Sequence, residues 1–250
     1  HTQNFILTAM SVVFLLMFII VSTLVLLLKH RQRKIKETKL LKKLMVMRME
    51  IGRGRITPHF IGNSLNIAMN DQMAGKPIDL TPLVKLLRMS TETADTLFVS
   101  LDTELQFIDY YVTVMSSSLG PDFKYNKNIE CDMDTTHIML PSMTLLTFVE
   151  NAVKHGLSKL PDDVEKTLEI NIRRHDKGVR IEVIDNGNCN KDAQLSNTNT
   201  GLKVIRQTLM LLNENYKEKE KMTFGVGNNG NGHGFMSWLY IPDNFTLNNY

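Results

Sequence analysis

The chain has 250 residues, which allows one or two domains, and its composition is that of a globular protein with one strongly apolar segment. The formal net charge of +3 is modest, so the distribution of charge is more informative than its sum. Its two cysteines, Cys131 and Cys189, have no second sulfur or paired histidines close in sequence, which argues against a disulfide framework and a zinc site. Because the first residue is His1 rather than Met, we expect the chain to be part of a longer protein.

The first long feature is a run of 24 residues without a charged side chain, Phe5 to Leu28. As a helix it would be about 36 Å long, enough to cross a hydrocarbon core of about 30 Å. A cleaved signal peptide is the alternative, but the run is too long and no small-residue cleavage site follows it. The sequence therefore predicts one transmembrane helix over residues 5–28.

A basic segment follows directly, with eight Lys or Arg between Lys29 and Lys43 and Glu37 as its one acidic residue. This asymmetry places the following residues in the cytoplasm and favours contact with lipid headgroups. Nucleic-acid binding is the alternative, and it ranks lower because the segment adjoins the membrane span. Over residues 29–57 we therefore predict a juxtamembrane segment and a short coiled-coil stalk, whose 4-3-4 spacing comes from Leu40, Leu44, Met47 and Ile51.

Pro58 must end or kink this stalk, and His59 follows it on the shoulder of the next helix. A neutral imidazole can act as a nucleophile through a ring nitrogen, although in isolation an ordinary surface histidine is the commoner explanation. Further helices are predicted over Leu80–Thr91 and Phe98–Met115. Together with a dimeric stalk, these helices predict a four-helix bundle made by two chains over residues 58–118.

The composition changes at residues 116–122, which form the best domain boundary. Beyond it, helices are predicted from Pro141 and over Leu202–Asn215. A mixed sheet with helices on one side, an α/β sandwich, is expected over residues 119–243, with a tail at 244–250, so the fold class is α+β. The predicted strands are Phe123–Cys131, Leu168–Arg174, Val179–Ile184, Met222–Val226 and Phe235–Ile241.

The segment Leu145–Leu157 carries the densest group of polar side chains on a predicted helix. One apolar stripe recurs at three- and four-residue spacing, formed by Leu145, Phe148, Val149, Ala152, Val153 and Leu157. The opposite side groups an acid, an amide, a cation and an imidazole, namely Glu150, Asn151, Lys154 and His155. This combination suits a polyphosphate with its metal ion, while an ordinary amphipathic surface helix is the alternative.

Five segments in order give the chain, over about Leu44 to Pro242, a resemblance to LytS/YehU-type sensor histidine kinases. These kinases carry an ATP-binding domain of the gyrase–Hsp90–kinase–MutL (GHKL) type. The segments are PHF at Pro58–Phe60, LDTELQFIDYY at Leu101–Tyr111, VENAVKHG at Val149–Gly156, DNG at Asp185–Gly187 and TGLKVIRQTL at Thr200–Leu209.

The resemblance implies ATP and Mg²⁺ as cofactors, and it assigns the polar side of the Leu145–Leu157 helix. Asn151 would hold Mg²⁺ through its side-chain oxygen, because hard cations favour oxygen ligands. Glu150 would orient or activate the attacking group. Lys154 and His155 would face the phosphates.

The last two of the five segments, DNG and TGLKVIRQTL, would hold the base and the phosphates. Asp185 would accept the adenine amino hydrogen, Gly187 would admit the base close to the backbone, and Asn186 would help to close that pocket. At the start of the helix from Leu202, Gly201 would present backbone N–H groups to phosphate, with Lys203 as a nearby cation.

The function implied is that of a homodimeric sensor histidine kinase, a single-pass protein of the bacterial inner membrane with a cytoplasmic catalytic part. It would autophosphorylate His59 from ATP and transfer the phosphoryl group to an aspartate of a response regulator, without direct nucleic-acid contact. The alternative is a divergent nucleotide-binding pseudokinase or a non-catalytic signalling scaffold. That alternative rests on departures from the family pattern, since Arg55 and Thr57 stand where Gln and Asn are common and Cys189 where a glycine is common.

Overall fold

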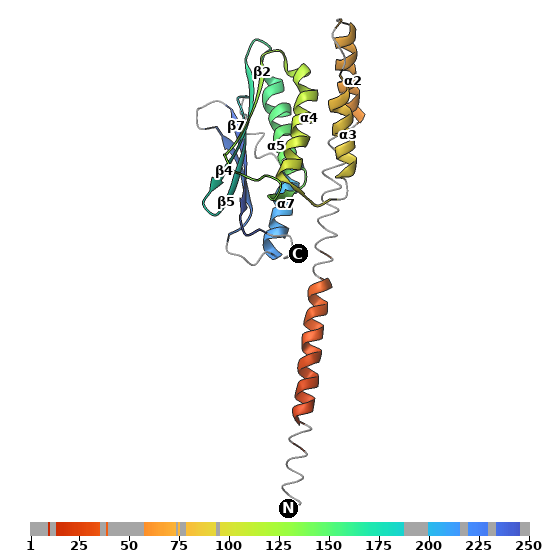
Figure 1. The fold of residues 1–250 in the computed structure, drawn as a ribbon, viewed down its shortest axis with the longest axis vertical. Coiled ribbons are helices and arrows are strands. Elements are labelled where there is room, and N and C mark those ends of the chain that lie inside the picture. Colours follow the sequence, from red (N-terminus) through yellow and green to blue (C-terminus); the bar gives the residue numbers. More distant parts are fainter. Residues whose placement is uncertain are drawn as a thin grey trace, which may run out of the picture. The chain divides into compact units, whose positions relative to one another are not determined.

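The computed structural model describes Met10, Lys39, Gly75 and residues 14–35, 58–73, 79–93, 96–187, 200–215, 220–229 and 234–245. It divides into two compact units, residues 1–43 and residues 44–250. The first unit contains a helix over Phe14–Ile35, with a mean hydropathy of 1.9, which is long and apolar enough to cross a membrane (Figure 1). This helix overlaps the predicted span. The predicted coiled-coil positions lie outside the described residues.

The described residues of the second unit form three helices before the sheet: α2 (Pro58–Met73), α3 (Thr81–Glu92) and α4 (Leu101–Leu119). A proline at the start of α3 suits a position whose N–H has no helical partner, and Leu83 and Leu86 on α3 are buried. Both α2 and α3 contact α4 (Figure 1). The two predicted helices before residue 120 are thus present, and whether two chains combine them into a four-helix bundle stays a prediction.

The start of α4 differs from the prediction. Phe98–Ser100 is a strand, β1, paired antiparallel with β3 (Met139–Pro141), where a helix from Phe98 was expected. The helix begins at Leu101 because Ser100 is extended and its hydroxyl accepts a 3.2 Å hydrogen bond from the Thr103 N–H. At its other end α4 continues to Leu119, so it enters the segment 116–122 in which a domain boundary was predicted.

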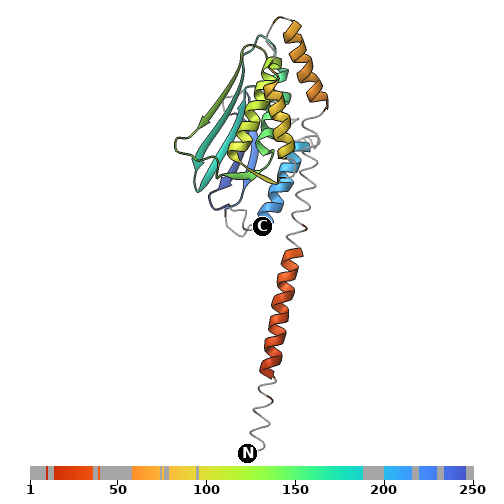
Figure 2. The same ribbon diagram turned by 45° about the vertical axis from the view of Figure 1, so that its right-hand side comes forward.

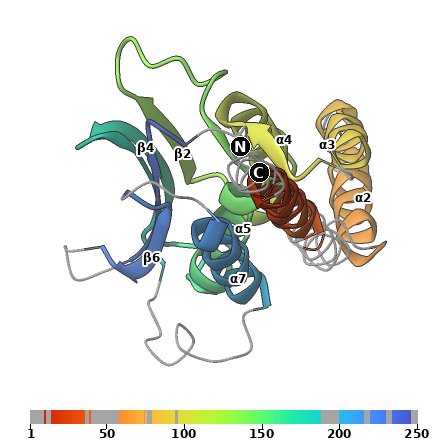
Figure 3. The same ribbon diagram turned by 90° about the horizontal axis from the view of Figure 1, so that it is seen from below.

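One five-stranded sheet forms the body of the second unit. Its strand order is β2-β4-β5-β7-β6, with β2 parallel to β4 and the other neighbours antiparallel. Helices α4, α5 (Thr144–Asn151) and α7 (Thr200–Asn215) lie on one face of this sheet (Figures 2 and 3). The predicted α/β sandwich is therefore confirmed. The strands are β2 Phe123–Ile129, β4 Lys166–His175, β5 Gly178–Asp185, β6 Thr223–Asn228 and β7 Phe235–Pro242.

The core lies between the sheet and these helices. Along β4, Leu168, Ile170 and Ile172 are buried and alternate with half-buried residues, because successive side chains of a strand point to opposite faces. Phe148 on α5 stacks with Phe224 on β6, with ring centroids 6.3 Å apart. Burying a side chain of this size stabilises the fold by about 1.5–3 kcal/mol. This packing holds α5, which carries Asn151, against the sheet.

Candidate nucleotide-binding site

Helix α5 carries the predicted polar face, but it is shorter than expected. The α-helix begins at Thr144 rather than Pro141 and ends at Asn151. It continues as a π-helix over Ala152–Gly156 and a 3₁₀ turn over Leu157–Lys159. Single π turns inside helices occur frequently at functional sites. The six residues of the predicted apolar stripe are all buried, but Thr144, Leu146 and Thr147 are buried as well, so the first part of α5 is enclosed on every side.

The four polar residues of this segment differ in exposure. Glu150 and Asn151 are half-buried, and the Asn151 Nδ2 atom is buried. Lys154 and His155 are exposed. Partial burial lowers the pKa of His155, and the nearby charges of Lys159 and Lys154 lower it further. These effects favour the neutral form of the His155 imidazole.

Asp185 ends strand β5 as a buried carboxylate, only 2% exposed. Its Oδ1 accepts a 2.8 Å hydrogen bond from the Gly187 N–H. Burial raises the pKa of Asp185 to about 6, and the hydrogen bond from Gly187 opposes this rise. The carboxylate is thus an acceptor that is costly to keep charged unless a donor binds to it.

Three glycines surround Asp185 closely. A Cβ atom added to Gly156 would collide with Asp185 Oδ1, and one added to Gly187 would lie 2.8 Å from the same atom and collide with the Gly156 backbone. Gly234, with φ +98°, lies against the Asp185 carbonyl in the same way. The end of the π turn, the end of β5 and the start of β7 therefore meet at one point. A larger side chain at any of these positions would displace the Asp185 carboxylate or the backbone next to it.

Sequence reasoning placed Asp185 and Gly187 in one site but did not assign Gly156 or Gly234 to it. Gly156 is the last residue of the VENAVKHG segment, so this motif could have indicated that Gly156 belongs to the site. Gly234 comes just before a strand and is separated from Asp185 by a long stretch of sequence. Only the pairing of β5 with β7, which joins Asp185 to Phe235, brings Gly234 to this point.

The Asn186 side chain is used within the sheet. Its Oδ1 accepts a 2.8 Å hydrogen bond from the Thr167 N–H, and its Nδ2 donates a 2.7 Å hydrogen bond to the Glu165 carbonyl. These bonds join the end of β5 to the start of β4. They hold the Asp185–Gly187 turn in place, and a direct contact of Asn186 with a nucleotide stays a prediction.

Helix α7 supplies the remaining predicted positions. It begins at Thr200, with Gly201 and Leu202 half-buried and Lys203 exposed in its first turn. Helices α5 and α7 are in contact, so this N-terminus belongs to the same side of the sheet as Asn151. Backbone N–H groups at a helix start can bind phosphate, although a phosphate at Gly201 stays a prediction. Residues 188–199, which include Cys189, lie outside the described residues.

His59 is the second residue of α2. Its backbone is helical, and its side chain is outside the described part of the structure. The approach of His59 to the α5 residues therefore stays a prediction.

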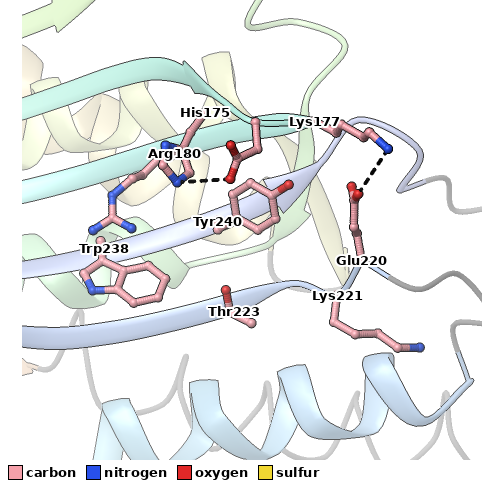
Figure 4. A pocket seen from close by; sticks show the side chains of 9 residues that line it. His175, Lys177, Arg180, Glu220, Lys221, Thr223, Trp238 and Tyr240 are labelled. Carbon is pink, nitrogen blue, oxygen red and sulfur yellow. Dashed lines mark ion pairs between the residues drawn. The ribbon is translucent and has the colours of Figure 1, made fainter.

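A separate cavity of about 520 Å³ lies on the sheet around the β4–β5 turn, as Figure 4 shows. Two of its lining cations form ion pairs, with Lys177 Nζ 3.7 Å from Glu220 and Arg180 Nε 2.7 Å from Glu182, and Lys221 Nζ donates a 3.0 Å hydrogen bond to the Asn213 carbonyl. Polyphosphate would have to displace these pairs, and none of the predicted site residues lines the cavity. It is lined by His175, Asp176, Lys177, Arg180, Glu220, Lys221, Thr223, Trp238 and Tyr240.

The family model described as histidine kinase matches residues 47–123. The sensor protein LytS of Oceanobacillus iheyensis is 30% identical over 156 residues, which are 61% of this chain and 25% of that protein. The sensor protein kinase HptS of Staphylococcus aureus (strain USA300) is 25% identical over 187 residues, 73% of this chain and 31% of that protein. The chain thus spans about a quarter to a third of the length of these relatives.

These matches show that the chain is related to the histidine kinases. One of the similar proteins is a LytS sensor protein, so the predicted resemblance is confirmed. Among solved structures, the nucleotide-free catalytic domain of histidine kinase ThkA aligns with 58% of this chain and 93% of its own chain. Its sequence identity is 12% and its TM-score 0.42. That likeness is loose, so the fold class follows from the sheet order and helices described above.

Proposed function

We propose that this chain is the membrane-anchored kinase part of a homodimeric sensor histidine kinase. It uses Mg-ATP to phosphorylate His59 and then passes the phosphoryl group to an aspartate of a response regulator. One observation carries the proposal. A buried carboxylate, Asp185, adjoins two glycines that admit no side chain, Gly156 and Gly187, at the end of the segment that carries Asn151.

The adenine end of ATP is assigned to Asp185. Its Oδ1 already accepts the Gly187 N–H, and we assign its Oδ2 to the adenine amino group. The backbones of Gly156 and Gly187 pack directly around this carboxylate because neither residue has a Cβ atom. A donor from the base also offsets the cost of keeping this buried carboxylate charged.

The phosphate end is assigned to Asn151, Lys154, His155 and the start of α7. In the described part of the chain, no group of three or more His, Cys, Asp or Glu side chains could hold a metal ion. This fits Mg²⁺, which is commonly held by few protein oxygens together with phosphate oxygens and water. When bound, Mg²⁺ neutralises charge on the transferring phosphate. Lys154 adds a positive charge, while Gly201, Leu202 and Lys203 offer N–H groups and a cation.

In the transfer step, a ring nitrogen of His59 forms a bond to the γ-phosphorus as the bond from that phosphorus to the bridging oxygen breaks. ADP is the leaving group, and Glu150 orients the imidazole or accepts its proton. The aspartate of the response regulator then displaces the histidine nitrogen. The residues act mainly by positioning and by neutralising charge.

The remaining parts of the proposal concern anchoring and dimerisation. The Phe14–Ile35 helix would anchor the chain in the cell membrane among lipids, with the kinase part in the cytoplasm. Exposed apolar side chains on α2, on α3 and just before α3 support a homodimer, because a second copy could cover them. These side chains are Leu65, Met69, Met73, Leu80 and Val84.

The test separates a kinase from a scaffold. The full chain, reconstituted in lipid nanodiscs, is first titrated with Mg-ATP by calorimetry and then incubated with γ-labelled ATP. We expect saturable binding and the incorporation of acid-labile, alkali-stable label. Binding without label would favour the divergent pseudokinase, and the absence of both would favour a scaffold that binds no nucleotide.

A further inference from the structure

A buried carboxylate from a different helix caps the start of α5. Glu104 on α4 is only 4% exposed. Its Oε1 accepts a hydrogen bond from the Met143 N–H, and its Oε2 accepts hydrogen bonds from the N–H groups of Leu145 at 3.1 Å and Leu146 at 3.3 Å. Both oxygens are therefore engaged with backbone donors at the N-terminus of α5.

Glu104 supplies hydrogen-bond acceptors that α5 itself lacks at its N-terminus. The first N–H groups of a helix have no partner within the helix, and the N-cap position is occupied by Met143, whose side chain has no oxygen. Met143 also has a left-handed backbone, with φ +67°, which is unusual for a residue other than glycine. Glu104 accepts its N–H in that conformation. A carboxylate at this end is also favoured by the helix dipole.

Glu104 therefore fixes where α5 begins, and α5 leads directly to the proposed metal ligand. Asn151 is the last residue of the helix, about 9 Å along its axis from Leu145. The apolar stripe between them is buried, so the helix is held against the sheet along its length. A shift of its first turn would therefore be carried to Asn151.

We propose that Glu104 is a positioning residue for the Mg-ATP site, which acts through α5 on Asn151. This inference rests on the proposed nucleotide-binding function. Helix α4 also contacts α2, which carries His59, and α3. The same carboxylate therefore ties the helix of the nucleotide site to the helices of the proposed phosphoacceptor segment.

The first experiment uses Glu104→Gln, which keeps the side chain's size but replaces one accepting oxygen with an NH₂ donor. At least one of the three backbone N–H groups then faces a donor. We expect the Kd for Mg-ATP to rise about tenfold, the effect of losing roughly one hydrogen bond to a charged group. Hydrogen exchange at the Leu145 and Leu146 amides should become faster, as read by mass spectrometry.

The matched control is Asp109→Asn, on the same helix. The Asp109 carboxylate accepts hydrogen bonds from Tyr125 at 3.0 Å and Lys127 at 2.7 Å, so it contacts β2 and not α5. This substitution removes the same charge from α4. We expect it to lower the melting temperature while the Kd for Mg-ATP stays within twofold of the wild type.

A double-mutant cycle with Asn151→Ala separates positioning from a purely structural cap. If Glu104 acts through Asn151, the two substitutions are non-additive in the Kd for Mg-ATP and additive in melting temperature. Additive effects on the Kd would overturn the inference, as would wild-type affinity in Glu104→Gln. Wild-type affinity in Asn151→Ala would instead overturn the proposed nucleotide site. If Glu104→Gln shows no cooperative melting, Glu104→Asp replaces it, because it keeps both oxygens but shortens their reach, with the same expected results.

Discussion

Gly187 donates its backbone N–H to the carboxylate of Asp185, two residues earlier, over 2.8 Å. The bond turns the chain at the end of β5 and holds one carboxylate oxygen. It also brings the Gly187 backbone against Gly156 at the end of the π turn. The proposed adenine site is therefore built by backbone contact around a single buried acid.

Replacing Asp185 tests that acid directly. Asp185→Asn keeps the side chain's shape, and its amide can still accept the Gly187 N–H, but it then presents NH₂ to the adenine amino group. We expect the Kd for Mg-ATP to rise by about tenfold or more, since a buried donor facing a donor costs about 1–3 kcal/mol. Calorimetry measures the change. The result that contradicts the assignment is unchanged affinity in a variant that melts cooperatively.

The pH dependence of stability provides a second test of Asp185. Its pKa is about 6 in the folded chain, against an ordinary value of 3.8. Below about pH 4 the group is protonated in both states, and as pH rises towards 6 the unfolded chain ionises first, so folding loses stability. The loss is about 3 kcal/mol at most, at 1.36 kcal/mol per pKa unit. Urea unfolding should show that this loss, between pH 4 and pH 7, is absent in Asp185→Asn.

Nucleotide binding should have the opposite pH dependence. The proposed site needs the ionised carboxylate as an acceptor, so the affinity for Mg-ATP should fall as the pH is lowered below about 6. Titrations at pH 5.5 and 7.5 measure this. Equal affinity at the two pH values would argue against Asp185 as the acceptor of the adenine amino group.

The packing around the Asp185 carboxylate can be disturbed without removing its charge. A Cβ atom at Gly156 would collide with Asp185 Oδ1, so Gly156→Ala should abolish measurable Mg-ATP binding. The control is Gly227→Ala in β6, where an added Cβ atom meets nothing within 4 Å. We expect that variant to bind as the wild type does. Equal binding by both variants would show that the close contact between Gly156 and Asp185 is not needed for binding.

The hydrogen bonds of the Asn186 side chain should stabilise the folded chain. Asn186→Ala removes two hydrogen bonds, one to the backbone of β4 and one to the residue just before it, and we expect a loss of about 1–3 kcal/mol in the free energy of unfolding. Asn128→Ala is the control, because its amide also makes two hydrogen bonds but on an exposed strand, and it should change stability by about 0.5 kcal/mol or less. Urea unfolding compares the two. An equal loss in both variants would argue against the role of Asn186 at the β4–β5 join.

Local patterns in the sequence were enough to predict much of the fold. Alternation predicted the strands, and three- and four-residue spacing predicted the buried apolar residues of the segment Leu145–Leu157, because both depend on neighbours in sequence. The π turn after Asn151 and the pairing of Phe98–Ser100 with β3 were not predicted. Both depend on tertiary contacts.

In the candidate site, too, the sequence could predict the local features but not the tertiary contacts. Asp185 and Gly187 belong to one short motif, so sequence alone could place them together. Their contact with Gly156, and the capping of α5 by Glu104, join segments separated by many residues and required the folded structure.

The central claim is that His59 accepts the γ-phosphate of ATP bound at the Asp185 and Asn151 site. The most direct measurement is incorporation of label from γ-labelled ATP into the reconstituted wild type and into His59→Gln. The account predicts acid-labile, alkali-stable label in the wild type and none in His59→Gln, with equal Kd for Mg-ATP in the two proteins. Label that persists in His59→Gln would contradict it.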